Sequence, residues 1–354
     1  MNREFWVGKN VFITGHTGFK GSWLSLWLQD CGANLTGFSL DPNTEPNIFT
    51  CASVADGMKS IIGDIRNLEY LTSAMVDSSP DIVIHMAAQP LVRFSYENPH
   101  DTYSTNVMGT VNIFEAIRKT PSVKAVVNVT TDKCYENKEW VWGYREDEAM
   151  GGYDPYSSSK GCSELVTTAY RNSFFHNEHS AQIASARAGN VIGGGDWSKD
   201  RLVPDILKSL EKNEKVLIRN PNAIRPWQHV LEPLDGYLLL AEKLYIEGNI
   251  YAESWNFGPE DEDVKEVKII IDYLTETWSP NACWEHDNSN HPHEAQMLKL
   301  DISKAKKLLH WSPKLRLFDA LDNTRDWHKK WIKGDDPKLI TLDQIRAFER
   351  ITEK

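Results

Sequence analysis

The sequence of 354 residues contains no apolar run as long as a membrane span, and its first ten residues, MNREFWVGKN, lack the apolar segment of a secretory signal. Cysteine is scarce: five residues, an odd number, stand at spacings that fit neither a disulfide framework nor a zinc site. The net charge of −11 argues against nucleic acid and against an anionic membrane surface as partners. These absences predict a cytoplasmic globular protein in a reducing compartment.

What the sequence does contain is the composition of an ordinary soluble enzyme. Hydrophobic residues make up 41% of the chain and charged residues 25%. A chain of this length is long for one core and sufficient for two. We therefore expect two domains.

The first candidate site is a glycine-rich turn between a strand and a helix. Residues 11–14 are β-branched or aromatic and predict a strand, and residues 22–31 carry apolar side chains at helical spacing. The turn between them consists of Gly15, His16, Thr17, Gly18, Phe19, Lys20 and Gly21. A helix that begins there directs backbone N–H groups and the positive end of its dipole at a pyrophosphate. The pattern predicts a dinucleotide site, a turn without a ligand being the alternative.

An acidic residue follows the second predicted strand. Residues 35–40 predict that strand, and Asp41 comes directly after it. A carboxylate about twenty residues beyond the glycine turn is where the ribose hydroxyls of a dinucleotide are held, and it repels a 2′-phosphate. Asp41 therefore predicts that NAD binds better than NADP.

Further strand and helix patterns alternate through the first half of the chain. Strands are predicted at 61–63, 82–86, 125–129 and 183–186, and helices at 67–76, 97–118 and 154–175. Six strands that alternate with helices predict an α/β fold with a doubly wound, Rossmann-type parallel sheet, and a cofactor site outside the carboxyl ends of its strands. Further candidates for that site are Asp64, Ile65, Ala87, Ala88 and, on the helix at 97–118, Asn106.

The alternation becomes less regular after about residue 187. Residues 187–197 are rich in glycine, and we expect no regular element there. We therefore predict a dinucleotide-binding domain of residues 1–188 and a smaller α/β domain, mainly substrate-binding, of residues 189–354. Some of the later chain is expected to cross back into the first domain.

The catalytic candidates follow the fifth predicted strand. Thr131, Asp132 and Lys133 come at its end, and Tyr156 and Lys160 stand four residues apart at the start of the next helix. Four residues apart on a helix means the same face, one turn on. A hydroxyl, a carboxylate, two amines and a phenol can thus converge at the open end of one strand, which is the mixture that acid–base chemistry needs.

Together these features resemble the extended short-chain dehydrogenase/reductase family over nearly the whole chain. Within that family the chain is most similar to the sugar-nucleotide 4,6-dehydratases that act on CDP-glucose. The stretches that carry this resemblance are GHTGFKGSWL (15–24), AAQPLVR (87–93), TDKCYEN (131–137), RAGNVIGGGDW (187–197) and RPWQHVLEPLDGYL (225–238). The CDP group is implied by the resemblance alone.

The resemblance implies bound NAD and a reaction in three steps. The sugar is oxidised at C4 by hydride transfer to NAD, water is lost across C5 and C6, and the hydride returns to C6. The product is a 4-keto-6-deoxy sugar nucleotide, as in the deoxysugar biosynthesis that supplies lipopolysaccharide O-antigens. By family position Gln89, Arg93, Asn190 and Arg225 would contact the substrate, a surface position being the alternative for Arg93.

The resemblance also implies a task for each catalytic candidate. Tyr156 removes the proton of the C4 hydroxyl as a phenolate, a form that the Lys160 ammonium and the nicotinamide ring favour. Lys160 also bonds the nicotinamide ribose, and Thr131 orients the C4 oxygen. Asp132 stands at the family's acid position and would protonate the departing C6 hydroxyl.

Two residues depart from the family pattern. Lys133 stands where the better-known dTDP-glucose dehydratases carry the glutamate that takes the C5 proton. A lysine can serve as that base only when it is partly neutral, which burial and nearby positive charge favour. The alternative is that Lys133 only anchors the substrate. His16 stands where the family often has a smaller residue, and its imidazole is expected to loosen NAD or to redirect the diphosphate.

Three histidines in a polar loop suggest a metal, but we expect none. His286, His291 and His293 lie near Asp287 and Glu294. The loop also contains proline, and the reaction implied by the family needs no metal.

The resemblance also implies an oligomeric state, and the sequence leaves three alternative functions open. The family pairs the helices that correspond to 97–118 and 154–175 across a two-fold axis, which implies a homodimer or homotetramer. The alternatives are a nucleotide-sugar 4-epimerase or reductase, a dehydratase for a different sugar nucleotide, or a NAD-binding regulator without activity. Asp132 and Lys133 argue against an epimerase, which does not need them, and Tyr156 argues against a regulator, which needs no phenol base.

Overall fold

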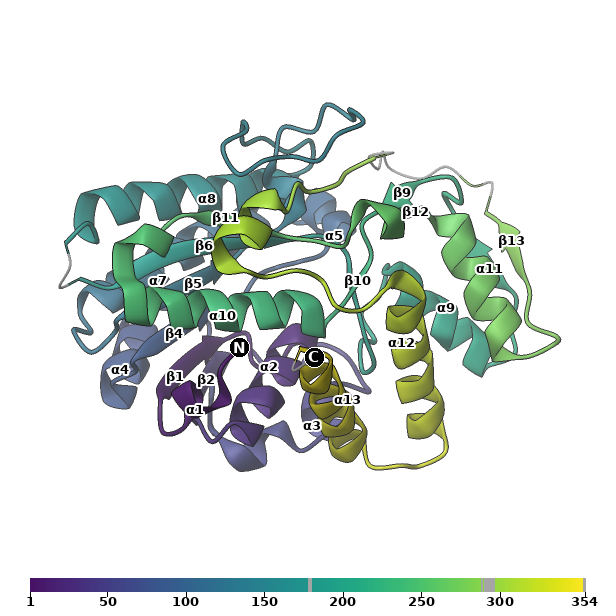
Figure 1. The fold of residues 1–354 in the computed structure, drawn as a ribbon, viewed down its shortest axis with the longest axis horizontal. Coiled ribbons are helices and arrows are strands. Elements are labelled where there is room, and N and C mark those ends of the chain that lie inside the picture. The colour runs from purple at the N-terminus through teal and green to yellow at the C-terminus, as the bar shows by residue number, and fades with distance from the viewer. Residues whose placement is uncertain (178–179, 288, 290–296, 353–354) are drawn as a thin grey trace.

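The fold is organised around one seven-stranded parallel sheet (Figure 1). The structure, a computed structural model, describes residues 1–177, 180–287, 289 and 297–352. In spatial order the strands are β11 (Ser254–Phe257), β6 (Gln182–Ala188), β5 (Ala125–Val129), β4 (Ile82–His85), β1 (Asn10–Thr14), β2 (Asn34–Ser39) and β3 (Lys59–Ile62). All neighbouring strands are parallel. This is the Rossmann-type sheet that the sequence predicts, with one strand more.

The additional strand comes from the second half of the chain. β11 pairs with β6, so that Asn256 lies opposite Arg187 and Phe257 opposite Ala188. The expectation of no regular element in 187–197 is therefore wrong at its start, because β6 continues through Ala188 and β7 (Val191–Ile192) follows. The local sequence does not predict the pairing of β6 with β11, because the two strands are distant in the chain.

Helices cover both faces of the sheet (Figure 1). On one face lie α4 (Leu68–Ser78), α7 (Gly109–Arg118) and α8 (Pro155–Phe174), and on the other α2 (Phe19–Asp30) and α10 (Leu231–Glu247), with α13 (Pro337–Thr352) against α2. Side chains of successive strand residues point to opposite faces of the sheet. Val126 packs in the cluster with α4 and α7, and Val127 packs in the cluster with α2 and α10. Both faces are buried, as parallel sheets require.

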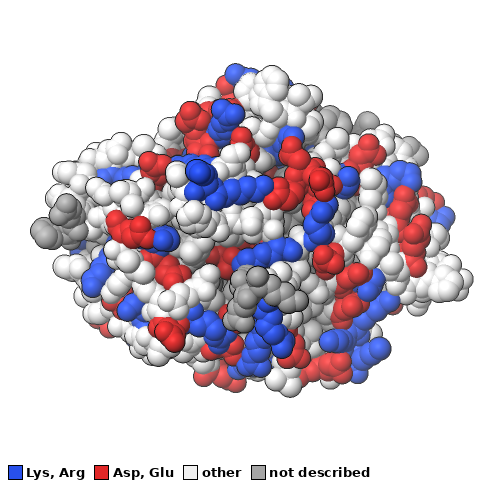
Figure 2. All heavy atoms as spheres, in the orientation of Figure 1, with Lys and Arg blue, Asp and Glu red and all other residues white. Residues whose placement is uncertain are grey.

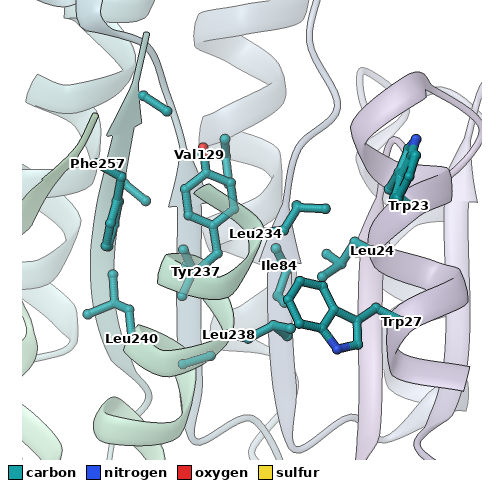
Figure 3. Close-up of a cluster of buried hydrophobic side chains, with 14 of the residues drawn as sticks. Trp23, Leu24, Trp27, Ile84, Val129, Leu234, Tyr237, Leu238, Leu240 and Phe257 are labelled. Carbon is teal, nitrogen blue, oxygen red and sulfur yellow. The ribbon is translucent and has the colours of Figure 1, made fainter. Parts of the chain in front are cut away.

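The hydrophobic cluster between α2 and α10 supports the end of β5 (Figure 3). Trp23 and Trp27 come from α2, and Leu234 and Tyr237 from α10. Val129, the last residue of β5, packs in the same cluster. The strand end from which the catalytic candidates emerge is therefore anchored in the core.

A polar cap sets the start of α8. Asp154 accepts hydrogen bonds from the Ser157 N–H at 2.9 Å and from the Ser157 hydroxyl at 2.6 Å, and Pro155 occupies the first turn. Because the helix begins there, Tyr156 lies in its first turn and Lys160 one turn further, on the same face.

The long helix predicted at 97–118 is built from separate pieces. α5 (Val92–Glu97) ends at Asn98, α6 (Pro99–Tyr103) starts anew, and a π-helical turn (Ser104–Met108) leads into α7. Such turns occur frequently at functional sites. This one contains Asn106, one of the cofactor candidates.

The remainder of the second half forms a smaller layer around its own hydrophobic cluster. Its short strands pair two by two: β7 with β10 (Gln228–His229), β8 (Val216–Ile218) with β13 (Trp284–His286), and β9 (Ile224–Arg225) with β12 (Lys265–Glu266). Its helices are α9 (Leu202–Glu211), α11 (Val267–Trp278) and α12 (Leu317–Ile332). Because α10, β11 and α13 lie with the sheet, the division of the chain at residue 188 stays a prediction.

Two short helices, α1 (Arg3–Trp6) and α3 (Ile48–Cys51), complete the sheet layer. On the face drawn in Figure 2, basic and acidic side chains are interspersed. Within the described ranges no helix is both long enough and apolar enough to cross a membrane.

Candidate active site

A cavity of about 320 Å³ opens at the carboxyl ends of β5 and β6. The five catalytic candidates line it: Thr131, Asp132, Lys133, Tyr156 and Lys160. On its other side the cavity reaches β8, β9 and α9 of the smaller layer. The site therefore lies outside the strand ends, where open α/β sheets bind their ligands.

The glycine turn has the bare backbone that a diphosphate requires. Gly15 has a φ of +76°, and a Cβ there would lie 2.8 Å from the Ala87 nitrogen. A Cβ on Gly21 would lie 2.1 Å from the Gly15 oxygen. Gly18 is the N-cap of α2, and within the described chain no side chain caps that end. The first N–H groups of α2 therefore remain for an anion, and the turn fits a dinucleotide diphosphate.

The His16 imidazole is packed beneath this turn and does not line the cavity. Its Nε2 lies 2.7 Å from the Ser60 hydroxyl, and its ring meets Phe49 edge-on. The ring fills the space beside Gly37, where a Cβ would come within 2.3 Å of it. Burial lowers the pKa of His16 to about 4, so the ring is neutral at pH 7. Its predicted effect on NAD affinity stays a prediction.

The carboxylate predicted to hold the ribose does not stand at the strand end. β2 ends at Ser39, and Asp41 is exposed beyond it. Hydroxyls occupy the strand end instead: the Ser39 Oγ lies 2.8 Å from the Thr17 Oγ1, which donates to the Leu40 carbonyl at 2.8 Å. Sequence analysis missed Ser39 because the strand was predicted to run one residue further.

The candidates after β3 make local contacts. Asp64 pairs with Arg66 at 2.6 Å, and this partner holds the pKa of the Asp64 carboxyl below its usual value. Ile65 is buried against Gly109, where a Cβ would lie 2.4 Å from the Ile65 Cδ1. Neither residue lines the cavity, so their contact with a cofactor stays a prediction.

Asn106 ties the exit of β4 to α8. Its Oδ1 accepts from the Gln89 N–H at 2.8 Å, and its Nδ2 donates to the Gln89 carbonyl at 3.0 Å and to the Ser159 hydroxyl at 2.8 Å. The Gln89 side chain, predicted to contact substrate, donates to the Thr102 hydroxyl at 2.9 Å instead and does not line the cavity. It orders the loop after β4, and its neighbours Ala88 and Pro90 line the cavity, whereas Ala87 does not.

Thr131 lies beside the carboxylate of the site. Its hydroxyl donates to the Asp132 Oδ1 at 3.0 Å. Its oxygen also receives the Lys133 backbone N–H at 3.4 Å. Burial raises the pKa of Asp132, and the nearby Lys133 opposes this. Asp132 is therefore suited to carry a proton.

Burial also has the largest effect on the pKa values of the two candidates on α8, Tyr156 and Lys160. It raises the pKa of Tyr156 to about 12, and the largest opposing effect is the hydrogen bond with Thr131. It lowers the pKa of Lys160 to about 8, against the effect of Glu164. The Lys160 Nζ donates to the Val129 carbonyl at 3.1 Å. Desolvation of the phenol therefore has the largest effect on its pKa; the expected lowering of the Tyr156 pKa by Lys160 and the nicotinamide ring together stays a prediction.

A buried ion pair supports the strand exits from behind. Glu164 accepts from Arg187 at 2.8 Å, from the Ser185 hydroxyl at 2.6 Å and from the Thr130 hydroxyl at 2.5 Å. Each of these side chains is buried. The network fixes β6 and α8 to the residue that directly precedes Thr131.

Two further amines reach the cavity. Lys133 lines the cavity and is only partly buried. Lys20 extends from the glycine turn, its Nζ donates to the Tyr237 hydroxyl at 3.2 Å, and burial lowers its pKa to about 7. Sequence analysis placed Lys20 in the cofactor turn but missed its position beside the catalytic candidates, because a motif does not show where a side chain points.

The far end of the cavity carries arginines. Arg93 and Arg219 lie 3.2 Å and 3.9 Å from the Asp200 carboxylate. Arg201, which precedes α9, and Arg225 on β9 also line the cavity. Of the four predicted substrate contacts, three line it: Arg93, Asn190 and Arg225. Arg201 and Arg219 were missed because neither belongs to a motif, and only the fold brings their segments together.

In the part of the chain that the structure describes, no group of three or more His, Cys, Asp or Glu side chains could hold a metal. The His286 Nε2 lies 3.0 Å from the Arg219 carbonyl. His291, His293 and Glu294 lie outside the described residues.

Known proteins share both the sequence and the fold. Residues 12–324 match the family described as GDP-mannose 4,6 dehydratase. The CDP-glucose 4,6-dehydratase of Salmonella typhimurium is 56% identical over 100% of both chains. Among solved structures, a dTDP-glucose 4,6-dehydratase from Bacillus anthracis in complex with NAD has a TM-score of 0.76 at 22% identity, over 94% of this chain and 100% of that one. A UDP-glucose 4-epimerase from Thermotoga maritima has a TM-score of 0.77 at 21% identity, over 91% and 99%.

Proposed function

Because the chain belongs to the GDP-mannose 4,6-dehydratase family, we propose that it is a NAD-dependent hydro-lyase that converts CDP-glucose to CDP-4-keto-6-deoxyglucose. The observation that carries this proposal is the 56% identity with the Salmonella CDP-glucose 4,6-dehydratase over both whole chains. The arrangement of the cavity supports it, since every group that the three-step reaction needs lines the same space.

NAD suits the sheet edge beside this cavity. The glycine turn offers the N–H groups of α2 to the cofactor diphosphate. Ser39 and Thr17 offer hydroxyls at the end of β2, where an adenosine ribose would lie. Bound there, NAD supplies the acceptor and later the donor for the hydride of C4. Lys160, one helical turn beyond Tyr156, would hold the nicotinamide ribose.

Each catalytic group is assigned to one atom of the sugar. Tyr156 takes the proton of the C4 hydroxyl while Thr131 holds the C4 oxygen. Lys133 takes the C5 proton, which the C4 ketone makes acidic, and Asp132 protonates the oxygen that leaves C6. The raised pKa of Asp132 supports its task, because a buried carboxyl holds its proton until a stronger acceptor forms.

The alternative task of Lys133 is to anchor the substrate without taking the C5 proton. Lys20 is then the next candidate for the base. Its amine lies in the same cavity, and burial lowers its pKa to about 7.

The arginine end of the cavity suits the substrate diphosphate. Arg93, Arg201, Arg219 and Arg225 come from four segments and line one space. Planar guanidinium groups bind phosphate oxygens with charge-assisted hydrogen bonds. The Asp200 carboxylate pairs with both Arg93 and Arg219.

The enzyme is proposed to act in the cytoplasm as a homodimer or homotetramer. Apolar side chains are exposed on the helices that the family pairs: Leu165 and Phe174 on α8 are 60% and 45% exposed, and Met108 before α7 is 52% exposed. Contact with a second copy would cover them. The five cysteines are free, as in a reducing compartment.

A 4-epimerase or reductase would use the same NAD site and the same Tyr156 and Lys160. Asp132 and Lys133 are the residues that separate the functions, because neither alternative needs an acid and a base for elimination. Mass spectrometry of the product tests the proposal. We expect CDP-glucose to lose one water and to give a keto sugar that absorbs ultraviolet light in alkali; an isomer of equal mass would contradict it. The same assay with dTDP-, GDP- and UDP-glucose tests the nucleotide.

A further inference from the structure

A carboxylate lies among the arginines that are proposed to bind the substrate diphosphate. The Asp200 Oδ1 is 3.2 Å from the Arg93 Nη1 and 3.9 Å from the Arg219 Nη1, and all three residues line the cavity. One carboxylate oxygen thus meets two guanidinium groups, one from α5 and one from the segment after β8. Because phosphate oxygens bind the same groups, Asp200 and a diphosphate would compete for them.

The two ion pairs of Asp200 have the geometry of contacts that can be exchanged. Both distances are longer than the roughly 2.7–2.9 Å of a strong charge-assisted hydrogen bond. The Asp200 side chain is 44% exposed, so water can replace its contacts with the arginines. The ion pair of Glu164 with Arg187 differs, because it measures 2.8 Å and both side chains are buried. Such a buried pair is fixed, whereas the pairs of Asp200 are not.

A second carboxylate at this end of the cavity is held more firmly. Asp196 is buried, lies 3.4 Å from Arg201 and accepts a hydrogen bond from the Ser198 N–H at 3.0 Å. Asp200 stands in a turn between β7 and α9. Its φ of +59° is in the left-handed region, which aspartate adopts more readily than most residues. The Asp200 side chain can therefore leave the arginines without disturbing a helix or a strand.

We propose that Asp200 occupies the diphosphate-binding arginines in the empty enzyme, leaves them when the substrate diphosphate binds and returns to them when the product leaves. This inference rests on the proposed function. A simple anion such as inorganic phosphate has to displace the carboxylate with its charge alone. A nucleotide sugar can displace it more readily, because its base, ribose and glucose make contacts of their own. Asp200 thereby determines which anions occupy the site.

The returning carboxylate also favours product release. The proposed product keeps the nucleotide and the diphosphate of the substrate, so the chemistry at the sugar does not weaken their contacts with the arginines. When the product leaves, the Asp200 carboxylate replaces the phosphate oxygens. Arg93 and Arg219 are then not left without a counter charge.

Binding of CDP to the NAD-saturated protein tests the proposal, because NAD then fills the glycine turn and CDP is left with the cavity. Asp200→Asn removes the charge, and asparagine also tolerates the left-handed backbone. In a calorimetric titration we expect the Kd of CDP to fall by about three- to tenfold, the range for partly exposed ion pairs. The KM for CDP-glucose should fall with it.

The sign of the change separates this role of Asp200 from others. A carboxylate that positions the arginines, or one that accepts a hydrogen bond from the cytosine amino group, would be needed for binding. Asp200→Asn would then bind CDP more weakly. Equal or weaker binding of CDP overturns the proposal.

Inorganic pyrophosphate, used as a competitor of CDP, shows whether the gain belongs to the phosphates. It has no base and no ribose, so Asp200→Asn should lower its Kd by about the same factor as that of CDP. Added salt should also weaken CDP binding more steeply in Asp200→Asn than in wild type, because the arginines lose their internal counter charge. A gain for CDP without a gain for pyrophosphate would overturn the proposal.

A double variant and a surface variant complete the experiment. In Arg219→Gln one of the two guanidinium groups is already absent, so adding Asp200→Asn should change the Kd of CDP by a smaller factor than in wild type. An equal factor would contradict the competition. Asp326→Asn is the control for loss of a carboxylate, since Asp326 pairs with Arg325 at 2.7 Å on α12, outside the cavity. It should leave the Kd of CDP unchanged.

Failure of this inference is distinct from failure of the proposed function. If the proposed function is wrong, the wild-type protein forms no keto-deoxy product from CDP-glucose. If only the role of Asp200 is wrong, the wild-type protein forms that product and Asp200→Asn does not tighten the binding of CDP.

Discussion

The two ends of the cavity are built in different ways. At the end formed by β5 and α8, the candidate reacting groups come from two short stretches of sequence, and all of them except the partly buried Lys133 are buried. At the other end, arginines from four separate segments meet, and Arg93 and Arg219 keep 33% and 24% of their side chains exposed. We propose that the first end carries out the chemistry and that the second binds the charge of the substrate diphosphate. Substitutions at the two ends should therefore change different kinetic constants.

The largest effect is expected at the buried end. Tyr156→Phe keeps the ring packing and removes the oxygen that receives the C4 proton. We expect kcat to fall by about a hundredfold or more, with no NADH absorbance in a single turnover. Tyr153→Phe, at a side chain that is 81% exposed in the preceding loop, is the control. Normal NADH formation in Tyr156→Phe would mean that another group takes the proton.

A second variant at the buried end separates oxidation from elimination. Lys133→Met should still reduce bound NAD but form product about a hundredfold more slowly, because the C5 base is lost. In heavy water, NMR of recovered substrate should show no deuterium at C5. Lys138→Met, at a lysine that pairs with Glu136 on the surface, is the control. Exchange at C5 as fast as in wild type would move the base to another residue, and Lys20→Met would then be examined in the same way.

A smaller effect is expected at the arginine end. Arg219→Gln should raise KM by about tenfold with little change in kcat, because a charge-assisted hydrogen bond to the diphosphate is lost in the ground state and in the transition state alike. Arg118→Gln, at an arginine that pairs with Glu115 on α7, is the control. A fall in kcat at unchanged KM would contradict the interpretation that the arginine end only binds the substrate.

The smallest effect is expected outside the cavity, at Asp41. NAD should bind more tightly than NADP, and Asp41→Asn should change that preference by no more than about fivefold, because an exposed charge contributes little. Titration of both cofactors into cofactor-free protein measures this. If Asp41→Asn binds both cofactors equally, Asp41 reaches the ribose after all, and the hydroxyls of Ser39 and Thr17 are secondary.

The sequence predicts the sheet, and it predicts that the five catalytic candidates lie together, because both depend on local rules. Alternating strands and helices require a parallel sheet, and the carboxyl ends of its strands meet at one edge. Helical periodicity places Tyr156 and Lys160 on one face. The same local rules place the end of β2 one residue too far, since the strand ends at Ser39; contact of Asp41 with the cofactor stays a prediction.

Family resemblance predicts four substrate contacts, and these stay predictions, but the fold places their side chains differently. Arg93, Asn190 and Arg225 line the cavity, whereas the Gln89 side chain turns to Thr102. A position in a motif places the backbone near a site, but the rotamer and the neighbouring hydrogen-bond partners decide where the side chain goes.

By itself the sequence determined the α/β alternation, the glycine turn and the group of acid–base residues after β5, because each follows from contacts between residues close in the chain. Only the tertiary structure decided that β11 joins the sheet, that Lys20 reaches the cavity and that Arg201 and Arg219 meet Arg93 there. It also placed the Thr131 hydroxyl 3.0 Å from the Asp132 carboxylate. These features depend on which distant segments pack together, and the free energy of that packing belongs to the whole fold rather than to any one stretch of sequence.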